Sequence, residues 1–313
     1  MDWPTTIATA RKFMPLLEAS WPHFVEEMKG RIADGANVPF DSILALNCRT
    51  EISMGLMTDG CTSLAWKTPD KSFMAQNWDW EPAQEANLVL LHIKRDSSVT
   101  SMPSVCQVTE AGIIGKIGIN AAGVGVCLNA IRVRGVDFSR LPCHLALRVV
   151  LDSASRADAV SALHKAGVAA AIHILVADHT GATSIETSSH ALVLRDTEAN
   201  GPRLAHSNHF LYSHDERVPL MVVPDESIRR VQRAAALMED EAETGSGPDF
   251  STLERILEDE DNGPYGINKA GTNLQPLRTL FSIVMDLGKR QATARVGRPH
   301  ALSMRLLLDP CRL

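Results

Sequence analysis

The sequence predicts an α+β protein in which β-sheets pack together and helices cover the outside. Three observations support this fold class. The chain begins with apolar residues at helical spacing, continues with short β-rich runs, and then alternates between helical and strand-like segments up to its last residues. Segments in this order can stack as layers around a shared core. At 313 residues the chain is long enough for a large core within a single unit.

Residues 5–33 form the first helical segment. Their apolar side chains recur mostly at steps of three and four residues, which is the spacing of one helix face. Pro22 suits the first turn of a second helix within this segment, because the N–H that proline lacks has no helical partner there. Asp41 is expected to cap a short helix over Ser42–Asn47, since its carboxylate can accept from the first N–H groups of a helix.

From Cys61 to about Ala130 the pattern changes to strands. Phe73–Trp80, Leu88–Ile93 and Ile113–Ile119 are short runs with the composition of β-strands. Turns rich in Gly, Asn and Ala separate the β-rich runs, which is typical of antiparallel strands. We therefore expect antiparallel pairing in this part of the chain.

The second half of the chain alternates between helices and strands. Ser155 and Asp158 provide a start signal for a helix over Ser155–Ala166, and Gly167 provides a stop. Thr244–Pro248 has the composition of a flexible connector. The other expected helices are Pro142–Ser153, Glu226–Ala242 and Ser251–Leu257, and the expected strands are Ala171–Ala177, Thr183–Thr187, Leu192–Arg195, Thr279–Met285, Gln291–Val296 and Ser303–Leu308.

Composition and charge argue against several function classes. A net charge of -6 argues against a nucleic-acid partner, because such binding draws on clustered Lys and Arg to neutralise phosphates. The sequence has no apolar run of eighteen residues and no signal peptide at its start, so we expect an intracellular protein without a membrane span. The six cysteines lack paired spacing, which indicates neither a zinc site nor a disulfide framework.

The pair Gly60-Cys61 is the stretch with the clearest chemistry. A cysteine sulfur is the best nucleophile among the side chains at neutral pH, and a glycine before it leaves the peptide bond unhindered. The chain could therefore cut itself at this bond. Cys61 would then become a new N-terminus, and its α-amine, with a pKa of about 7.7–8.0, could activate its own thiol.

The segment from Asp59 to Trp80 resembles the start of the β subunit in the isopenicillin N acyltransferase family, whose members are cysteine-type N-terminal-nucleophile enzymes made as precursors. The resemblance implies a four-layer αββα sandwich of the N-terminal-nucleophile hydrolase type. Residues 1–60 would be the α subunit, short relative to the family, and residues 61–313 the β subunit, the two forming one domain. The resemblance also covers Asn47–Glu51, Thr109–Gly125, His206–His209, Glu258–Pro264 and Ala294–Pro299.

The resemblance implies roles for single residues in an α/β heterodimer made from one precursor. Cys61 would attack the Gly60 carbonyl in the precursor and the acyl substrate in the mature enzyme. Asp79 maps onto the family's active-site aspartate, which can orient the freed amine. Asn208 maps onto the asparagine whose side-chain N–H stabilises the tetrahedral intermediate, and Ser188 onto a serine that the family needs for activity. Without the resemblance each residue would have an ordinary role. Cys61 would be a buried thiol and Asp79 an acid at a strand end. Asn208 would be a turn residue and Ser188 a serine with local hydrogen bonds.

The chain departs from the family pattern just before the strand that starts at Thr279. Family members carry a Ser-Arg pair there, and without a gap the arginine position is filled by Pro276. Arg278 could supply a guanidinium from two residues further on, along a different backbone path. Substrate specificity could therefore differ from penicillin formation.

Two groups of residues raise further binding hypotheses. Arg229, Arg230 and Arg233 form a basic cluster, which is expected to be a solvated face or to meet the phosphates of a coenzyme A donor. Three histidines within residues 206–214 have spacings that could serve a metal. No carboxylate or cysteine completes a recognisable set in the sequence, so structural or hydrogen-bonding roles are expected.

These observations lead to three functional hypotheses. The first is a self-cleaving acyltransferase that exchanges an amide side chain with an acyl-CoA, as in the conversion of isopenicillin N to hydrophobic penicillins. The second is an amidohydrolase in which water takes the acyl group from another small N-acyl amine. The third is a non-catalytic remnant, suggested by the short first segment and by Pro276. No cofactor is expected besides acyl-CoA as co-substrate, and the ending Cys311-Arg312-Leu313 fits a peroxisomal address.

Overall fold

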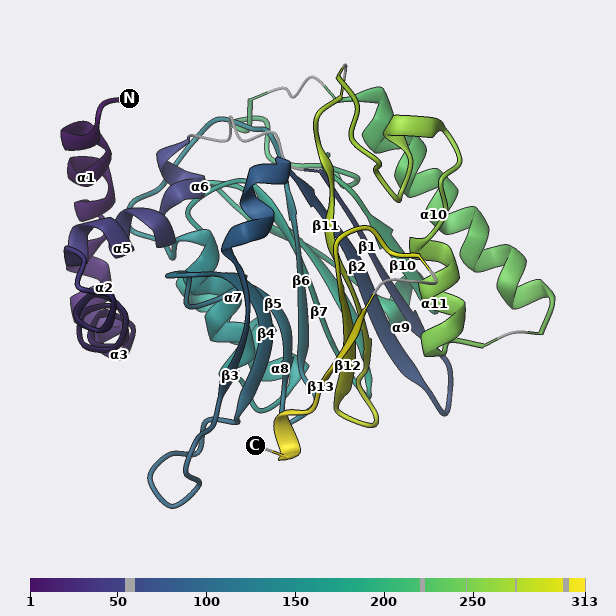
Figure 1. Cartoon of the computed structure of the whole chain (residues 1–313), viewed down its shortest axis with the longest axis horizontal. Helices are drawn as coiled ribbons and strands as arrows, with labels where there is room; N and C mark the ends of the chain where they lie inside the picture. The colour runs from purple at the N-terminus through teal and green to yellow at the C-terminus, as the bar shows by residue number, and fades with distance from the viewer. Residues whose placement is uncertain (54–59, 220–222, 246, 274, 301–303, 313) are drawn as a thin grey trace.

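The computed structural model describes residues 1–53, 60–219, 223–245, 247–273, 275–300 and 304–312. In these residues two antiparallel sheets lie face to face, and helices cover the outer side of each (Figure 1). The layers therefore follow the order helix, sheet, sheet, helix. This arrangement confirms the expected α+β class and the four-layer αββα sandwich.

The first sheet contains β1 (Gly60–Lys67), the strand predicted to carry the nucleophile. Alternate residues of β1 point to opposite faces of the sheet. Cys61 and Ala65 join the core between the sheets, whereas Leu64 and Trp66 pack under the outer helices. The strand order is β10 (Arg203–His206), β1, β2 (Ser72–Trp80), β11 (Arg278–Asp286), β12 (Gln291–Val296) and β13 (Arg305–Leu308).

The second sheet is buried on both faces along its central strands. Every residue of β7 (Ile172–Asp178) is buried, because the first sheet covers one face and helices cover the other. The strand order is β3 (Leu88–Ile93), β4 (Val105–Glu110), β5 (Ile117–Asn120), β6 (Gly125–Ala130), β7, β8 (Gly181–Thr187) and β9 (Leu192–Asp196).

The outer helices follow the start and stop signals of the sequence. Ser155 accepts a hydrogen bond from the Asp158 N–H at 3.1 Å and starts α8 (Arg156–Ala166). Gly167 ends this helix with a φ of 66°, a value that favours glycine. The second sheet is covered by α7 (Cys143–Leu151) and α8, and the first by α10 (Asp225–Glu243) and α11 (Phe250–Leu257).

The short helix expected from Ser42 begins two residues earlier, and Asp41 does not cap it. Pro39 precedes α5 (Phe40–Asn47), so Asp41 lies inside the first turn. Its carboxylate accepts a hydrogen bond from Arg11 at 2.7 Å. The predicted cap was wrong because this long-range ion pair uses the carboxylate. The other N-terminal helices are α1 (Trp3–Arg11), α2 (Met14–Ser20), α3 (Pro22–Glu26), a π-helical stretch (Glu27–Ala33), α4 (Asp34–Ala36) and α6 (Arg49–Ile52).

The strand predicted over Ile113–Ile119 is shorter in the structure, where β5 covers Ile117–Asn120. Two glycines in the preceding turn explain the difference. Gly112 has a φ of +94°, and Gly115 lies so close to α7 that a Cβ atom would approach the His144 carbonyl oxygen to 2.1 Å. The chain therefore turns and presses against the helix before it joins the sheet.

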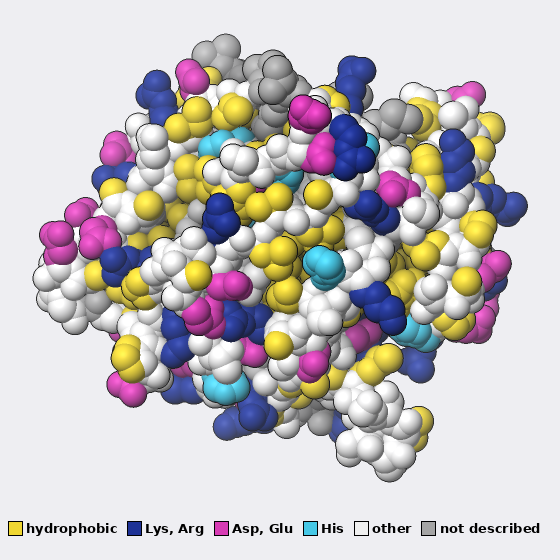
Figure 2. All heavy atoms as spheres, turned by 180° about the vertical axis from the view of Figure 1, so that it is seen from behind, with side chains coloured by type: hydrophobic (Ala, Val, Ile, Leu, Met, Phe, Trp, Pro, Cys, Tyr) yellow, Lys and Arg dark blue, Asp and Glu magenta, His cyan; other side chains and the backbone are white. Residues whose placement is uncertain are grey.

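Four residues of the segments named above lie outside the described residues, namely Asp59, Ser246, Ser303 and Leu313. No helix in the described ranges is long and apolar enough to cross a membrane. On the face shown in Figure 2, acidic and basic side chains are interspersed with apolar and uncharged ones. The remaining short helices are η2 (Pro82–Asn87), α9 (Thr197–Asn200), η3 (Gly263–Tyr265) and η4 (Pro310–Arg312).

Candidate active site

The Gly60-Cys61 bond lies at the start of β1, where strand pairing fixes its neighbours. Gly60 is opposite Asp79 and Cys61 is opposite Trp78, both on β2. The Cys61 side chain belongs to the core between the sheets and is fully buried. The backbone N–H of Cys61, which is the amide of the predicted cleavage bond, donates to the Asn208 side-chain oxygen at 2.8 Å. The structure thus brings together three of the residues predicted for the site.

Asn208 is held in one orientation by its own hydrogen bonds. Its Nδ2 donates to the Ala130 carbonyl at 3.0 Å, and its backbone N–H donates to Ser227 Oγ at 2.8 Å. The side-chain oxygen therefore faces Cys61, whose N–H it accepts. Because Ala130 takes one of the two Nδ2 hydrogens, the other is the one that could serve a tetrahedral oxyanion, and this role stays a prediction.

Arg230 is a candidate functional residue whose environment was predicted wrongly. Only 1% of it is exposed, and it contacts Cys61, the predicted nucleophile. Its guanidinium donates to the Cys61 carbonyl oxygen, to Thr62 Oγ1 at 3.1 Å and to Asn208 Oδ1 at 2.8 Å. The expectation of a solvated face was wrong for this arginine. The spacing could have shown it, since the buried residues of α10 are Ser227, Arg230, Ala234 and Met238, one inward stripe.

We expect Arg230→Gln to lower the free energy of unfolding by about 3 kcal/mol, because it leaves buried acceptors without their charged donor. It should also slow cleavage of the precursor. Arg229→Gln is the matched control, since Arg229 is the exposed neighbour on the same helix and its loss should change stability by less than about 0.5 kcal/mol. Denaturant titration and intact mass measure both effects. Equal stability of the two variants would contradict the structural role of Arg230.

Asp79 is a fully buried carboxylate with one oxygen available. Oδ1 accepts a hydrogen bond from Thr279 Oγ1 at 2.7 Å, whereas Oδ2 has no hydrogen-bond partner among the described residues. Burial raises the pKa of Asp79 to about 6, against the opposing effect of the Lys269 and Arg230 charges. The carboxylate therefore titrates near neutral pH and can accept a proton or a hydrogen bond at the site.

Lys269 is a second functional candidate that the sequence analysis missed. It is fully buried, and its ammonium pairs with Glu226 at 3.2 Å. Its backbone N–H donates to the Thr279 hydroxyl, the same hydroxyl that donates to Asp79. Burial lowers the pKa of the Lys269 ammonium. No sequence pattern around Asn268-Lys269 marks it, because only the folded chain brings this lysine beside β1.

Two predicted site residues make their hydrogen bonds elsewhere in the described part of the chain. Ser188 follows β8, and its hydroxyl accepts from the backbone N–H groups of His190 at 3.2 Å and Ala191 at 3.1 Å. Arg278 starts β11 and forms an ion pair with Glu85. The roles of Ser188 and Arg278 in activity stay predictions.

The histidines of residues 206–214 form hydrogen bonds around a buried carboxylate. His206 Nε2 and His214 Nε2 each lie 2.8 Å from a Glu186 oxygen. His209 Nδ1 lies 2.7 Å from Ser227 Oγ, the group that also accepts the Asn208 N–H. These contacts hold the loop that carries Asn208. Within the described ranges no grouping of His, Cys, Asp and Glu could hold a metal ion.

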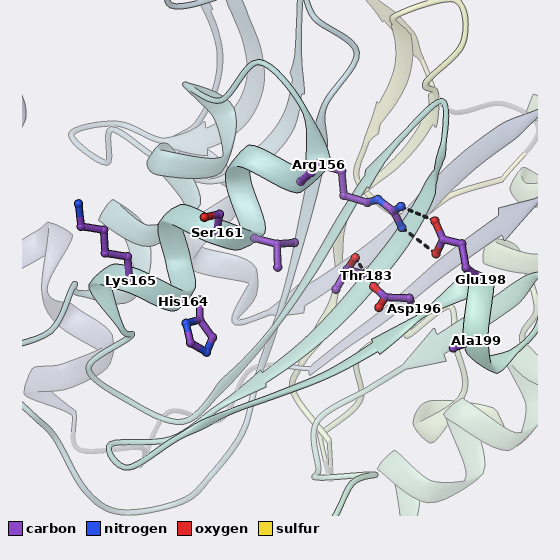
Figure 3. Close-up of a pocket in the computed structure, with 10 residues that line it drawn as sticks. Arg156, Ser161, His164, Lys165, Thr183, Asp196, Glu198 and Ala199 are labelled. Carbon is purple, nitrogen blue, oxygen red and sulfur yellow. Dashed lines mark hydrogen bonds and ion pairs between the residues drawn. The ribbon is translucent and has the colours of Figure 1, made fainter.

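Of two cavities in the structure, one lies away from the residues around Cys61 and the other borders them. One of about 670 Å³ lies between α8, β8, β9 and α9, where Arg156 and Glu198 form an ion pair (Figure 3). None of its lining residues belongs to the cluster around Cys61. A second cavity, of about 410 Å³, is lined partly by Glu226, the partner of Lys269, and so borders the site.

Comparison with solved structures identifies the fold. Two mutant crystal structures of conjugated bile acid hydrolase from Clostridium perfringens are each 14% identical in sequence. An arginine-to-leucine variant has a TM-score of 0.55 and covers 81% of this chain and 93% of its own. A cysteine-to-alanine mutant has a TM-score of 0.54 and covers 80% and 92%. With a buried cysteine on the first strand of the sandwich, this fold is that of the N-terminal-nucleophile hydrolase class.

The family is defined by sequence comparison. The chain belongs to the acyl-coenzyme A:6-aminopenicillanic acid acyl-transferase family, whose model matches residues 66–301. A relative from Emericella nidulans, the 40 kDa form of acyl-coenzyme A:6-aminopenicillanic-acid-acyltransferase, is 36% identical over 294 residues. That match covers 93% of this chain and 79% of the relative. The family that the sequence motifs predicted is therefore confirmed.

Proposed function

We propose that this protein is a self-activating acyltransferase that moves an acyl group from a coenzyme A thioester to an amine through a Cys61 acyl-enzyme. One observation carries the proposal. Side chains from three separate segments, Asp79, Asn208 and Arg230, converge on Gly60 and Cys61. Membership of an acyltransferase family supports the same reaction.

Activation would begin within the intact chain. Cys61 Sγ attacks the Gly60 carbonyl carbon, the C–N bond breaks, and the thiol proton ends on the departing Cys61 nitrogen. Water then hydrolyses the Gly60 thioester: its oxygen adds to the Gly60 carbonyl carbon, one of its protons goes to sulfur, and the proton released by the new Gly60 carboxylate goes to the Cys61 amine. Residues 1–60 and 61–313 would remain together as an α/β heterodimer in one domain. Asp79 Oδ2, which has no partner in the described part of the chain, supports a contact with the new amine.

The mature enzyme would use the same sulfur on its substrates. The Cys61 amine takes the thiol proton, the thiolate attacks the acyl-CoA carbonyl, and coenzyme A leaves with that proton. The acceptor amine then attacks the Cys61 thioester, and its proton returns to sulfur through the Cys61 amine. Asn208 and Arg230 would stabilise the negative charge that develops on the reacting carbonyl oxygen, a role supported by their hydrogen bonds to the Cys61 backbone.

The substrates are proposed from the family. The Emericella nidulans relative is named for acyl-coenzyme A and 6-aminopenicillanic acid, and we propose the same classes of small molecule for this chain. An amidohydrolase is the second candidate, because the bile acid hydrolases share the fold. A peroxisomal address at Cys311-Arg312-Leu313 agrees with acyl-CoA as co-substrate, and Ser188 and Arg278 stay candidate activity residues.

An acyl-transfer assay tests this proposal. We expect purified protein, after its intact mass shows the cut at Gly60-Cys61, to release coenzyme A from phenylacetyl-CoA at least tenfold faster with 6-aminopenicillanic acid than without it. Chromatography should show the matching amide product. Release that does not depend on the amine would instead support the hydrolase. If the chain stays uncut and turns over no thioester, only the hypothesis of a non-catalytic remnant is left.

A further inference from the structure

Gly60 lies between two buried charged groups of opposite sign. A Cβ atom on this residue would lie 2.8 Å from Lys269 Nζ and 3.0 Å from Asp79 Oδ2. Real Cβ atoms essentially never approach other heavy atoms to less than 3.0 Å. Gly60 is the first residue of strand β1 and pairs with Asp79 of β2, and a strand position does not by itself require glycine. The restriction to glycine comes from Lys269 and Asp79.

Neither charged group can move aside easily. The Lys269 ammonium is held by Glu226 at 3.2 Å, and its backbone N–H is held by Thr279 Oγ1 at 3.0 Å. The same Thr279 hydroxyl donates to Asp79 at 2.7 Å. Lys269 and Asp79 are both fully buried, so a shift of either would separate a charge from its partners in a poorly solvated place. The pair therefore forms a fixed wall beside the Gly60 Cα.

The cleavage bond and the later substrate present the same geometry to the nucleophile. In the precursor, Cys61 Sγ attacks the Gly60 carbonyl carbon. In the mature enzyme the same sulfur attacks an acyl carbonyl, and the acyl group must use the space that Gly60 has left. The α-carbon of the acyl group would then lie where the Gly60 Cα lay. This step rests on the proposed acyl-enzyme function.

We propose that Lys269 and Asp79 together determine specificity at the carbon next to the reacting carbonyl, first by selecting glycine for self-cleavage and then by excluding acyl groups branched at the α-carbon. Lys269 and Asp79 lie on the side of Gly60 where an L-residue would carry its Cβ. They therefore exclude a substituent in place of only one of the two hydrogens on the acyl α-carbon. A branched acyl group is therefore discriminated by its handedness. Unbranched acyl groups carry only hydrogen at that position and pass.

The self-cleavage arm of the test does not depend on the acyl-transfer reaction. We expect Gly60→Ala to be cut more than tenfold more slowly than the wild type, measured by intact mass against time. Gly30→Ala is the matched control, because a Cβ at Gly30 would meet no heavy atom within 4 Å beyond its chain neighbours and the backbone of its own helix. Cleavage of Gly60→Ala at a rate within tenfold of the wild type would overturn the proposal.

A double-mutant cycle with Lys269→Ala assigns the effect to the lysine. Gly60→Ala should slow cleavage less in the Lys269→Ala background than in the wild type, since the side chain that meets the new methyl group is gone. An equal effect in both backgrounds would show that Lys269 is not part of the wall. If Lys269→Ala does not fold, the other two arms still decide.

The acyl-transfer arm uses the unmodified mature protein. The kcat/KM is measured for phenylacetyl-CoA and for the two enantiomers of 2-phenylpropionyl-CoA. We expect one enantiomer to react more than tenfold more slowly than phenylacetyl-CoA and the other to react within tenfold of it. Equal slowing of both enantiomers would contradict the discrimination by handedness. Values within tenfold for both enantiomers would overturn the inference while leaving the proposed function intact. If no thioester is turned over, the proposed function is refuted. The self-cleavage rate of Gly60→Ala would then be the test of whether Lys269 and Asp79 select glycine.

Discussion

Cys61→Ala should give a single uncut chain without acyltransferase activity. The alanine methyl group cannot attack the Gly60 carbonyl, so neither the thioester nor the new amine can form. Because one substitution removes the nucleophile and blocks formation of its base, we expect a loss on the order of a million-fold, the scale seen when a hydrolase loses its nucleophile. Intact mass spectrometry and the coenzyme A release assay measure the two effects.

Cys127→Ala is the control for this experiment. Cys127 is also a fully buried cysteine, on β6, and burial raises the pKa of its thiol well above the usual range. This variant should still be cut between Gly60 and Cys61 and should keep its activity. Normal cleavage of Cys61→Ala would rule out Cys61 as the nucleophile, whereas loss of cleavage in both variants would show that the effect is not specific to Cys61.

Asp79→Asn should reduce kcat/KM by about 10²- to 10⁴-fold, the range associated with one positioned acid–base group. The amide keeps the size of the side chain but loses the charge that can hold the freed Cys61 amine. In the wild type the carboxylate form is the active one. With a pKa of about 6 for Asp79, activity should be present above pH 6 and decline as the pH falls through it.

The pH profile separates this role from a structural one. In Asp79→Asn the acidic limb near pH 6 should disappear, because the group that titrates there is gone. Asp286→Asn is the control, since Asp286 is a buried carboxylate at the opposite end of β11 from Thr279. That variant should keep the limb. A limb that persists in Asp79→Asn would assign it to another group.

The sequence predicted a nucleophile at Cys61 and most of the secondary structure. Gly60-Cys61 stands out because its chemistry is local, and β12 (Gln291–Val296) and β3 (Leu88–Ile93) have the bounds that their composition predicts. The start of α8 was predictable because Ser155 bonds three residues along the chain. Periodicity and caps act over a few residues, so they can be recognised without the fold.

Local sequence signals are unreliable for charged side chains that form ion pairs with residues from distant segments. Asp41 has the position of a helix cap, but Arg11 from another helix takes its carboxylate. Arg278 is likewise paired with Glu85 from another segment, and its role in activity stays a prediction. In each case a charged partner from elsewhere in the chain decides where the side chain goes.

The sequence by itself determined the family, the order of helices and strands and the cysteine on which the proposed chemistry depends. Only the tertiary structure decided which charges surround that cysteine. Arg230 reaches Cys61 across 169 positions of the chain, and Lys269 meets Gly60 from a segment without any motif. The physical reason is burial, because a buried charge must find its partners wherever the fold provides them.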